Sequence, residues 1–128
     1  MMEYGYKKRI DMPFAEAVSR VTEELGKQGF GVLTQIDVKA TLKKKIGVDL
    51  EDYVILGACN PPNAYKALQA EQDIGLMLPC NVVVYVRGGK TFVSAVLPTV
   101  SMGMIRNDSL KAVAIQVESK LKRVVDDV

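Results

Sequence analysis

Two glycines between two strongly β-forming segments constrain the fold of this 128-residue chain more than any other feature. Residues 82–87 and 91–97 are rich in valine and aromatic side chains, which favour extended strands, and Gly88 and Gly89 separate them. Glycine adopts positive φ angles at no steric cost. The pair therefore predicts a tight hairpin, and with it antiparallel pairing of the two strands.

The rest of the chain alternates between strand-like runs and segments whose apolar residues recur at helical spacing. Further strands are expected at residues 3–10, 30–36 and 53–58, the first of them at a sheet edge, so that the order is β-α-β-α-β-α-β-β-α. Asp108 or Ser109 is expected to cap the last helix. The apolar residues expected to face the core from the first, second and last helices are Phe14, Ala17, Val18, Val21 and Leu25; Val38, Leu42 and Ile46; and Leu110, Val113, Ala114, Val117, Leu121 and Val124.

The simplest architecture for this order is a two-layer α+β sandwich. Each helix has one apolar stripe and the hairpin requires antiparallel pairing, so we expect a mixed, mostly antiparallel sheet with helices on one main face. The length suits a single domain, residues 1–128. Because strands 53–58, 82–87 and 91–97 are too apolar for a fully solvated face, we also expect a homodimer.

Composition narrows the classes of function. A net charge of +2 is too small for a dedicated nucleic-acid binder. The chain has neither a secretory signal nor an apolar run of membrane-spanning length, so we expect a cytoplasmic protein with reduced thiols and no membrane partner. It contains no histidine, which removes the commonest general base and metal ligand. No carboxylates are placed for acid–base work, and these absences together weigh against an enzyme.

A cysteine and two asparagines follow the strand at 53–58, where the third helix should begin. Free N–H groups and the positive end of a helix dipole favour anions at such a junction and lower a thiol pKa. Cys59, Asn60 and Asn63 could therefore form a polar binding site with a reactive thiol. The structural alternative is that Cys59 is a small buried residue and Asn60 caps the helix before Pro61.

The Cys-Asn pair recurs at Cys80 and Asn81, directly before strand 82–87. The wide spacing of the two cysteines is not that of a zinc ribbon or a thioredoxin-like motif. A parallel crossover between them would leave them roughly 15–20 Å apart, whereas an antiparallel arrangement or a dimer would bring them together. Met102 and Met104 could then complete a soft ligand set for copper(I), although methionine more often fills gaps in a core.

Segments 57–61 (Gly-Ala-Cys-Asn-Pro) and 78–82 (Leu-Pro-Cys-Asn-Val), with the helix expected over 107–125, resemble a bacterial and archaeal family, the domain of unknown function numbered three hundred and two. The likeness covers nearly the whole chain. It implies a compact α+β fold, a tendency to dimerise and no settled activity. Members often have an acidic residue before the proline after the last strand, where this chain has Leu97, which weakens any carboxylate ligand there. The positions of interest that the resemblance implies are Cys59, Asn60, Pro61, Cys80 and Asn81.

Three functions remain open from the sequence. The leading hypothesis is a non-enzymatic domain that binds or senses a small ligand at the strand-to-helix junction. The second is handling of a soft metal, copper or zinc, or thiol redox chemistry, by Cys59 and Cys80. The third is a structural homodimerisation module whose motif residues only cap helices and turn the chain. The residues expected to bind a ligand are Cys59, Asn60, Asn63, Cys80 and Asn81, and those for a metal are Cys59, Cys80, Met102 and Met104.

Overall fold

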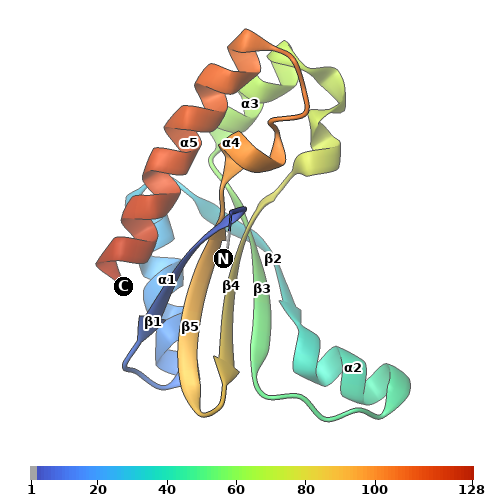
Figure 1. Ribbon diagram of the computed structural model, residues 1–128, viewed down its shortest axis with the longest axis vertical. Coiled ribbons are helices and arrows are strands. Elements are labelled where there is room, and N and C mark those ends of the chain that lie inside the picture. Colours follow the sequence, from blue (N-terminus) through green and yellow to red (C-terminus); the bar gives the residue numbers. More distant parts are fainter. Residues whose placement is uncertain (1–2) are drawn as a thin grey trace.

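The computed structural model describes residues 3–128, so the first two residues of the expected domain lie outside it. It contains a five-stranded sheet in the order β1-β5-β4-β3-β2, with helices arranged around it (Figure 1). The predicted class and order are confirmed, and a 3-10 helix and one short helix are added. The elements are β1 (Gly5–Ile10), α1 (Phe14–Lys27), β2 (Gly31–Asp37), α2 (Val38–Ile46), β3 (Tyr53–Cys59), α3 (Pro61–Ala70), η1 (Gln72–Met77), β4 (Cys80–Arg87), β5 (Lys90–Val96), α4 (Pro98–Ser101) and α5 (Asp108–Asp127).

The sheet is antiparallel throughout residues 3–128, where a mixed sheet was expected. The reason is that α2 and α3 are inserted between neighbouring strands that run in opposite directions. Each helix lengthens a hairpin connection and does not make a parallel crossover. The predicted tight hairpin is confirmed, since Gly88 and Gly89 have φ angles of 59° and 76° and Arg87 pairs with Lys90.

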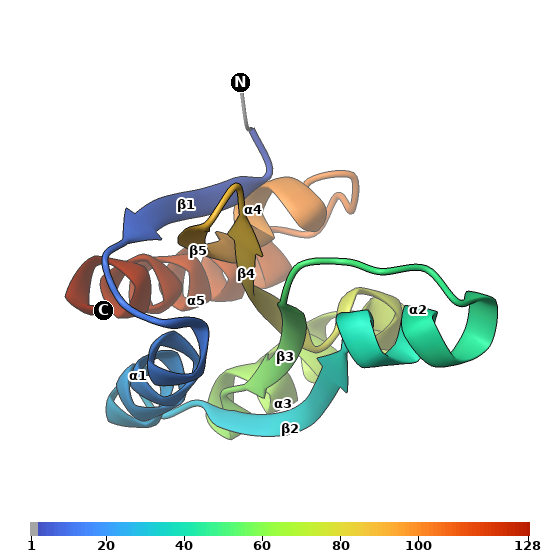
Figure 2. The same ribbon diagram turned by 90° about the horizontal axis from the view of Figure 1, so that it is seen from below.

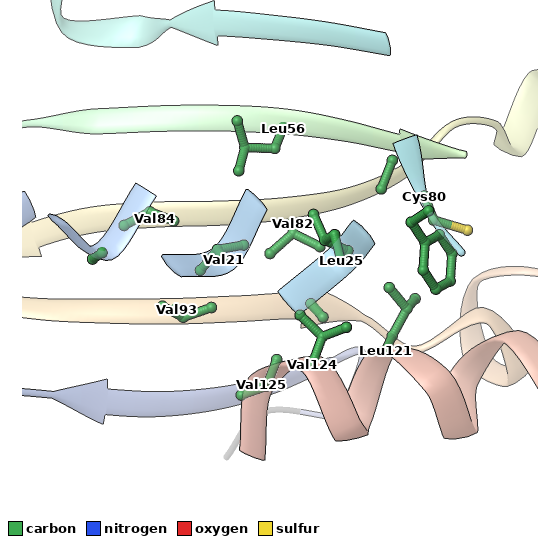
Figure 3. Close-up of a cluster of buried hydrophobic side chains, with 14 of the residues drawn as sticks. Val21, Leu25, Leu56, Cys80, Val82, Val84, Val93, Leu121, Val124 and Val125 are labelled. Atoms are coloured by element: carbon green, nitrogen blue, oxygen red, sulfur yellow. The ribbon is translucent and has the colours of Figure 1, made fainter. Parts of the chain in front are cut away.

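The main core lies between the sheet and the helices α1 and α5, which cover the same face of it (Figure 2). Figure 3 shows side chains from α1, α5, β3, β4 and β5 meeting there, with Cys80 at one end of the cluster. The stripes predicted for α1 and α5 are confirmed, because all their members are buried or half-buried. Full burial of an aliphatic side chain such as Leu25 or Leu121 contributes about 1.5–3 kcal/mol. A smaller cluster links α3 and η1 to α5, and its buried members are Ala67, Ile74, Met102, Leu110 and Ala114.

The helix α2 corrects a sequence prediction. Val38, Leu42 and Ile46 were expected to face the core, but α2 contains no buried residue and Ile46 is 68% exposed. The helix projects from the β2 edge, away from α1 and α5 (Figures 1 and 2). Val38 and Leu42 are half-buried but belong to neither core cluster, so the stripe packs only in part against its own chain and its end at Ile46 is left exposed.

The start of α5 corrects a smaller prediction, because the capping residue is Asn107 and neither Asp108 nor Ser109. The Oδ1 of Asn107 accepts a hydrogen bond from Leu110 N at 3.0 Å, and its Nδ2 donates to the carbonyl oxygen of Ala70 at 2.7 Å. The second bond joins the end of α3 to the start of α5, which the local sequence does not reveal. In the part of the chain that the structure describes, no helix combines the length and apolar character that crossing a bilayer requires.

Candidate functional site

A cavity of about 360 Å³ lies where β3 ends and β4 begins. Its volume falls within the range of small-molecule sites, about 300–1,000 Å³. Its wall is largely apolar and includes no charged side chain. The lining residues are Phe30, Leu33, Thr34, Ala58, Cys59, Asn60, Asn63, Ala64, Ala67, Leu68, Leu78, Pro79, Cys80, Pro98, Met102, Val113, Ala114 and Val117.

The antiparallel register brings both cysteines to this cavity. Ala58 of β3 lies opposite Cys80 of β4, so Cys59, the last residue of β3, is adjacent to the first residues of β4. Cys59 is half-buried and Cys80 is buried, and both line the cavity. Of the two geometries that the sequence left open, the structure has the one in which the cysteines share an end of the sheet.

The carboxamide of Asn60 is engaged within the fold. Its Oδ1 accepts hydrogen bonds from the backbone N of Asn63 at 3.3 Å and from the Asn63 Nδ2 at 3.1 Å. Its Nδ2 donates to the carbonyl oxygen of Gln28 at 3.2 Å. Asn60 thus caps α3 and also ties the start of α3 to the end of α1, which agrees with the capping interpretation.

Asn63 is the polar residue best placed to meet a ligand. It lines the cavity and is only 5% exposed. One of its amide hydrogens is bonded to Asn60. A carboxamide has a second hydrogen and an oxygen acceptor, so Asn63 could hold one polar atom of a bound molecule.

Burial raises the pKa of the Cys80 thiol to about 11, and the neighbouring Cys59 adds to the shift. Removing the thiol from water disfavours its charged form, so Cys80 is protonated at neutral pH. The thiolate is the form that attacks electrophiles and binds metals. In its present surroundings Cys80 is therefore a poor nucleophile and would have to lose its proton before it could bind a metal.

We expect the reactivity of Cys80 to follow this pKa. A Cys59→Ser variant removes the smaller cause of the shift and keeps the larger one, burial, so folded Cys80 should still have much less thiolate at pH 8 than the same thiol in denaturant. Iodoacetamide labelling followed by mass spectrometry should be slow at pH 8 and accelerate toward pH 11. The same shift should lower the free energy of unfolding as pH rises from 9 to 11, because the unfolded state then loses its proton first. Equal labelling rates in the folded and unfolded protein at pH 8 would contradict this environment.

The structure brings three of the four proposed sulfur ligands to the cavity and leaves the fourth outside it. Met102 is buried and lines the cavity with both cysteines, whereas Met104 is 75% exposed and lies outside the lining. Among residues 3–128, no group of three or more histidine, cysteine or acidic residues is arranged to hold a metal ion. A soft metal in this cavity would have to be bound by the thiols of Cys59 and Cys80 and the thioether of Met102. The Cys80 thiol would first have to lose its proton, which its raised pKa disfavours.

Of the second Cys-Asn pair, Cys80 lines the cavity and Asn81 does not. Asn81 is exposed and does not line the cavity, because successive side chains of a strand point to opposite faces of the sheet. Asn81 lies opposite Gly57 in the register. The cavity therefore gathers Cys59, Asn60, Asn63 and Cys80 of the predicted ligand-binding set, but not Asn81.

Sequence reasoning missed most of the cavity wall. Phe30, Leu78 and Val117 carry no signal that distinguishes a cavity lining from an ordinary core position. Gly57 did carry a signal, because a glycine inside an apolar strand marks a close approach of neighbouring groups. A Cβ atom there would collide with the Thr34 Oγ1 and lie 2.8 Å from the Pro79 Cγ, and Thr34 and Pro79 both line the cavity.

Comparison with known proteins agrees with this architecture. A family model described as a domain of unknown function, DUF302, matches residues 6–128. The crystal structure of an uncharacterized conserved protein DUF302 from Bacillus stearothermophilus has 34% sequence identity and a TM-score of 0.92, and the match covers 98% of each chain. No curated protein matches this sequence. The chain therefore belongs to the DUF302 family, the family that its two Cys-Asn segments resemble.

Proposed function

We propose that this domain binds a small, uncharged and largely apolar molecule in the cavity at the junction of β3 and β4. The observation that carries the proposal is a cavity of about 360 Å³ with no charged side chain in its wall. An apolar cavity of about 150 Å³ is large enough to bind benzene. By that measure the site has room for a molecule two to three times the size of benzene.

The exposure of two lining residues supports an entrance to the cavity on the side of β2 and α3. Leu33 is 68% exposed and Leu68 is 36% exposed, and both contribute to the wall. A ligand could therefore enter between these two leucines without unfolding the core.

The chemistry of the wall favours neutral ligands over ions and binding over catalysis. Transferring a charge into a site without a countercharge is very unfavourable, so anions and metal cations are disfavoured. The protonated state of Cys80 is a further reason to place a small molecule ahead of a soft metal. Thr34 and Asn63 are polar residues of the wall that could orient a ligand with one polar atom.

The test uses N-phenyl-1-naphthylamine, an uncharged dye whose fluorescence rises in apolar surroundings. We expect saturable fluorescence enhancement with one dye per chain. Ala64 is half-buried on α3 and lines the cavity, so an Ala64→Phe variant should bind the dye at least about tenfold more weakly, a loss of about 1.4 kcal/mol.

The matched control is Ala112→Phe, the same substitution at an exposed position of α5 outside the cavity. This variant should bind the dye as the unmodified chain does. Absence of saturable binding to the unmodified chain, or equal weakening by both substitutions, would refute the proposed site. Far-UV circular dichroism of each variant separates a filled cavity from an unfolded chain.

A further inference from the structure

Residues 31–50, which comprise β2, α2 and the segment after α2, form an arm that its own chain leaves largely uncovered (Figure 1). None of the nine residues of α2 is buried. Isolated helices shorter than about 12–15 residues are marginal in water, so a helix of this length needs packing against something else. The large apolar side chains exposed on the arm are Leu33, Ile36, Ile46, Val48 and Leu50.

We propose that this arm is the surface through which a second copy of the chain docks, with the two β2 strands paired antiparallel across a twofold axis. β2 lies at the edge of the sheet and contains no lysine, arginine or proline. Edges that must stay unpaired usually carry such residues. The opposite edge strand, β1, carries Lys7, Lys8 and Arg9 and is protected in that way.

Self-pairing of β2 explains why the occupant is a second copy. A strand that pairs antiparallel with its own equivalent forms a closed dimer with twofold symmetry. Pairing of β2 with β1 of another copy would instead give an open chain of molecules, and the positive charges of β1 oppose it. One edge for each chain that has no lysine, arginine or proline, and that is regular over residues 34–37, is therefore consistent with a dimer.

The exposed area of the arm is of the size that a stable dimer needs. Its five exposed aliphatic side chains offer on the order of 400 Å² of apolar surface, close to the apolar part of a standard interface of about 800 Å² for each partner. Two of its lysines are neutralised within the chain, since Lys43 lies 2.9 Å from Asp49 and Lys39 lies 3.6 Å from Asp52. These ion pairs reduce the repulsion between two identical arms.

The open face of the sheet is a weaker candidate for the interface. Tyr85 stacks against Tyr53 on one side and Phe92 on the other, at centroid distances of 5.2 and 5.4 Å. The Nζ of Lys7 lies 4.8 Å from the centre of the Phe92 ring. The rings on this face are therefore covered by contacts with one another and with Lys7, whereas α2 has no buried residue and is only half-buried at Val38, Thr41 and Leu42.

Antiparallel pairing also has a consequence for the cavity, a step that rests on the proposed function. The register shift of β2 falls between Val32 and Thr34, which leaves residues 34–37 as its regular part. Pairing through this part places α2 of one copy beside Leu33 of the other, at the entrance of the cavity. Leu42 and Ile46 of α2 would then cover the exposed side of that entrance, so the binding site is complete only in the dimer.

The experiment measures the mass of the full chain by sedimentation equilibrium. We expect about 28 kDa, twice the chain mass of 14.0 kDa, and a fall to 14.0 kDa in an Ile46→Glu variant. Ile115→Glu is the matched control, because Ile115 is similarly exposed but lies on α5, and this variant should stay dimeric. Hydrogen exchange should show that the α2 amides are protected in the dimer and exchange rapidly in Ile46→Glu.

Each other outcome overturns a defined part of the inference. A chain that stays at 14.0 kDa up to millimolar concentration, or a dimer that Ile46→Glu leaves intact, rules out docking through the arm. Dye binding separates the two proposals. A dimer that fails to bind N-phenyl-1-naphthylamine refutes only the ligand site, whereas a monomeric Ile46→Glu that binds the dye with unchanged affinity refutes only the closure of the cavity. We expect the monomer to bind it about tenfold more weakly.

Discussion

An Asn60→Ala variant is expected to lose about 2–4 kcal/mol of the free energy of unfolding. The substitution removes the cap of α3 and leaves the buried amide of Asn63 without its acceptor. It also removes the donor to the carbonyl oxygen of Gln28, which joins α3 to α1. Urea denaturation followed by circular dichroism measures the loss, and the slope of the transition should be unchanged.

Two variants separate the cap from the long-range bond. Asn60→Ser keeps an uncharged acceptor for the backbone N of Asn63 and loses the donor to Gln28, so its loss should be intermediate. Asp37→Ala removes the exposed cap of α2, whose Oδ1 accepts only from Ala40 N at 2.9 Å, and should cost about 0.5–1 kcal/mol. If Asn60→Ala costs no more than Asp37→Ala, the bond between α3 and α1 contributes nothing to stability.

Those parts of the fold that depend on local signals could be predicted from the sequence. The Gly88-Gly89 turn and the apolar stripes of α1 and α5 are properties of a few neighbouring residues, and the structure confirms them. The orientation of α2 could not be predicted, because an apolar stripe indicates a helix without indicating what covers it. Val38, Leu42 and Ile46 look the same in sequence whether they face their own core or another molecule.

The candidate site was predictable only in its polar part. Cys59 and Cys80 stood out because the chain's two cysteines are each followed by asparagine. Whether the two cysteines lie at the same end of the sheet depends on the direction of β4 relative to β3. A helix between two strands is compatible with either direction, and only the sheet as a whole decides it. The apolar wall was invisible for another reason, since residues such as Val113 or Leu78 contact a cavity and a core through the same atoms.

Gly57→Ala is expected to destabilise the protein by about 1–3 kcal/mol, the usual cost of overpacking a well-filled site. The new Cβ would collide with the Thr34 Oγ1 and lie 2.8 Å from the Pro79 Cγ. Thr34 can rotate its side chain, but the ring of Pro79 is rigid, so the segment leading into β4 must shift.

That segment carries Cys80 and part of the cavity wall, so dye binding to Gly57→Ala should weaken together with stability. The control is Gly31→Ala on the neighbouring strand, where a Cβ meets nothing within 4 Å, and it should be neutral or slightly stabilising. Adding Thr34→Ala to Gly57→Ala should recover the share of the loss caused by the hydroxyl, and the remainder measures the contact with Pro79. Equal stability of Gly57→Ala and Gly31→Ala in urea denaturation would show that the close approach at Gly57 does not exist in solution. A measured difference would instead explain why a glycine precedes the first Cys-Asn pair: only a residue without a side chain lets β2, β3 and the start of β4 come close enough to build the cavity.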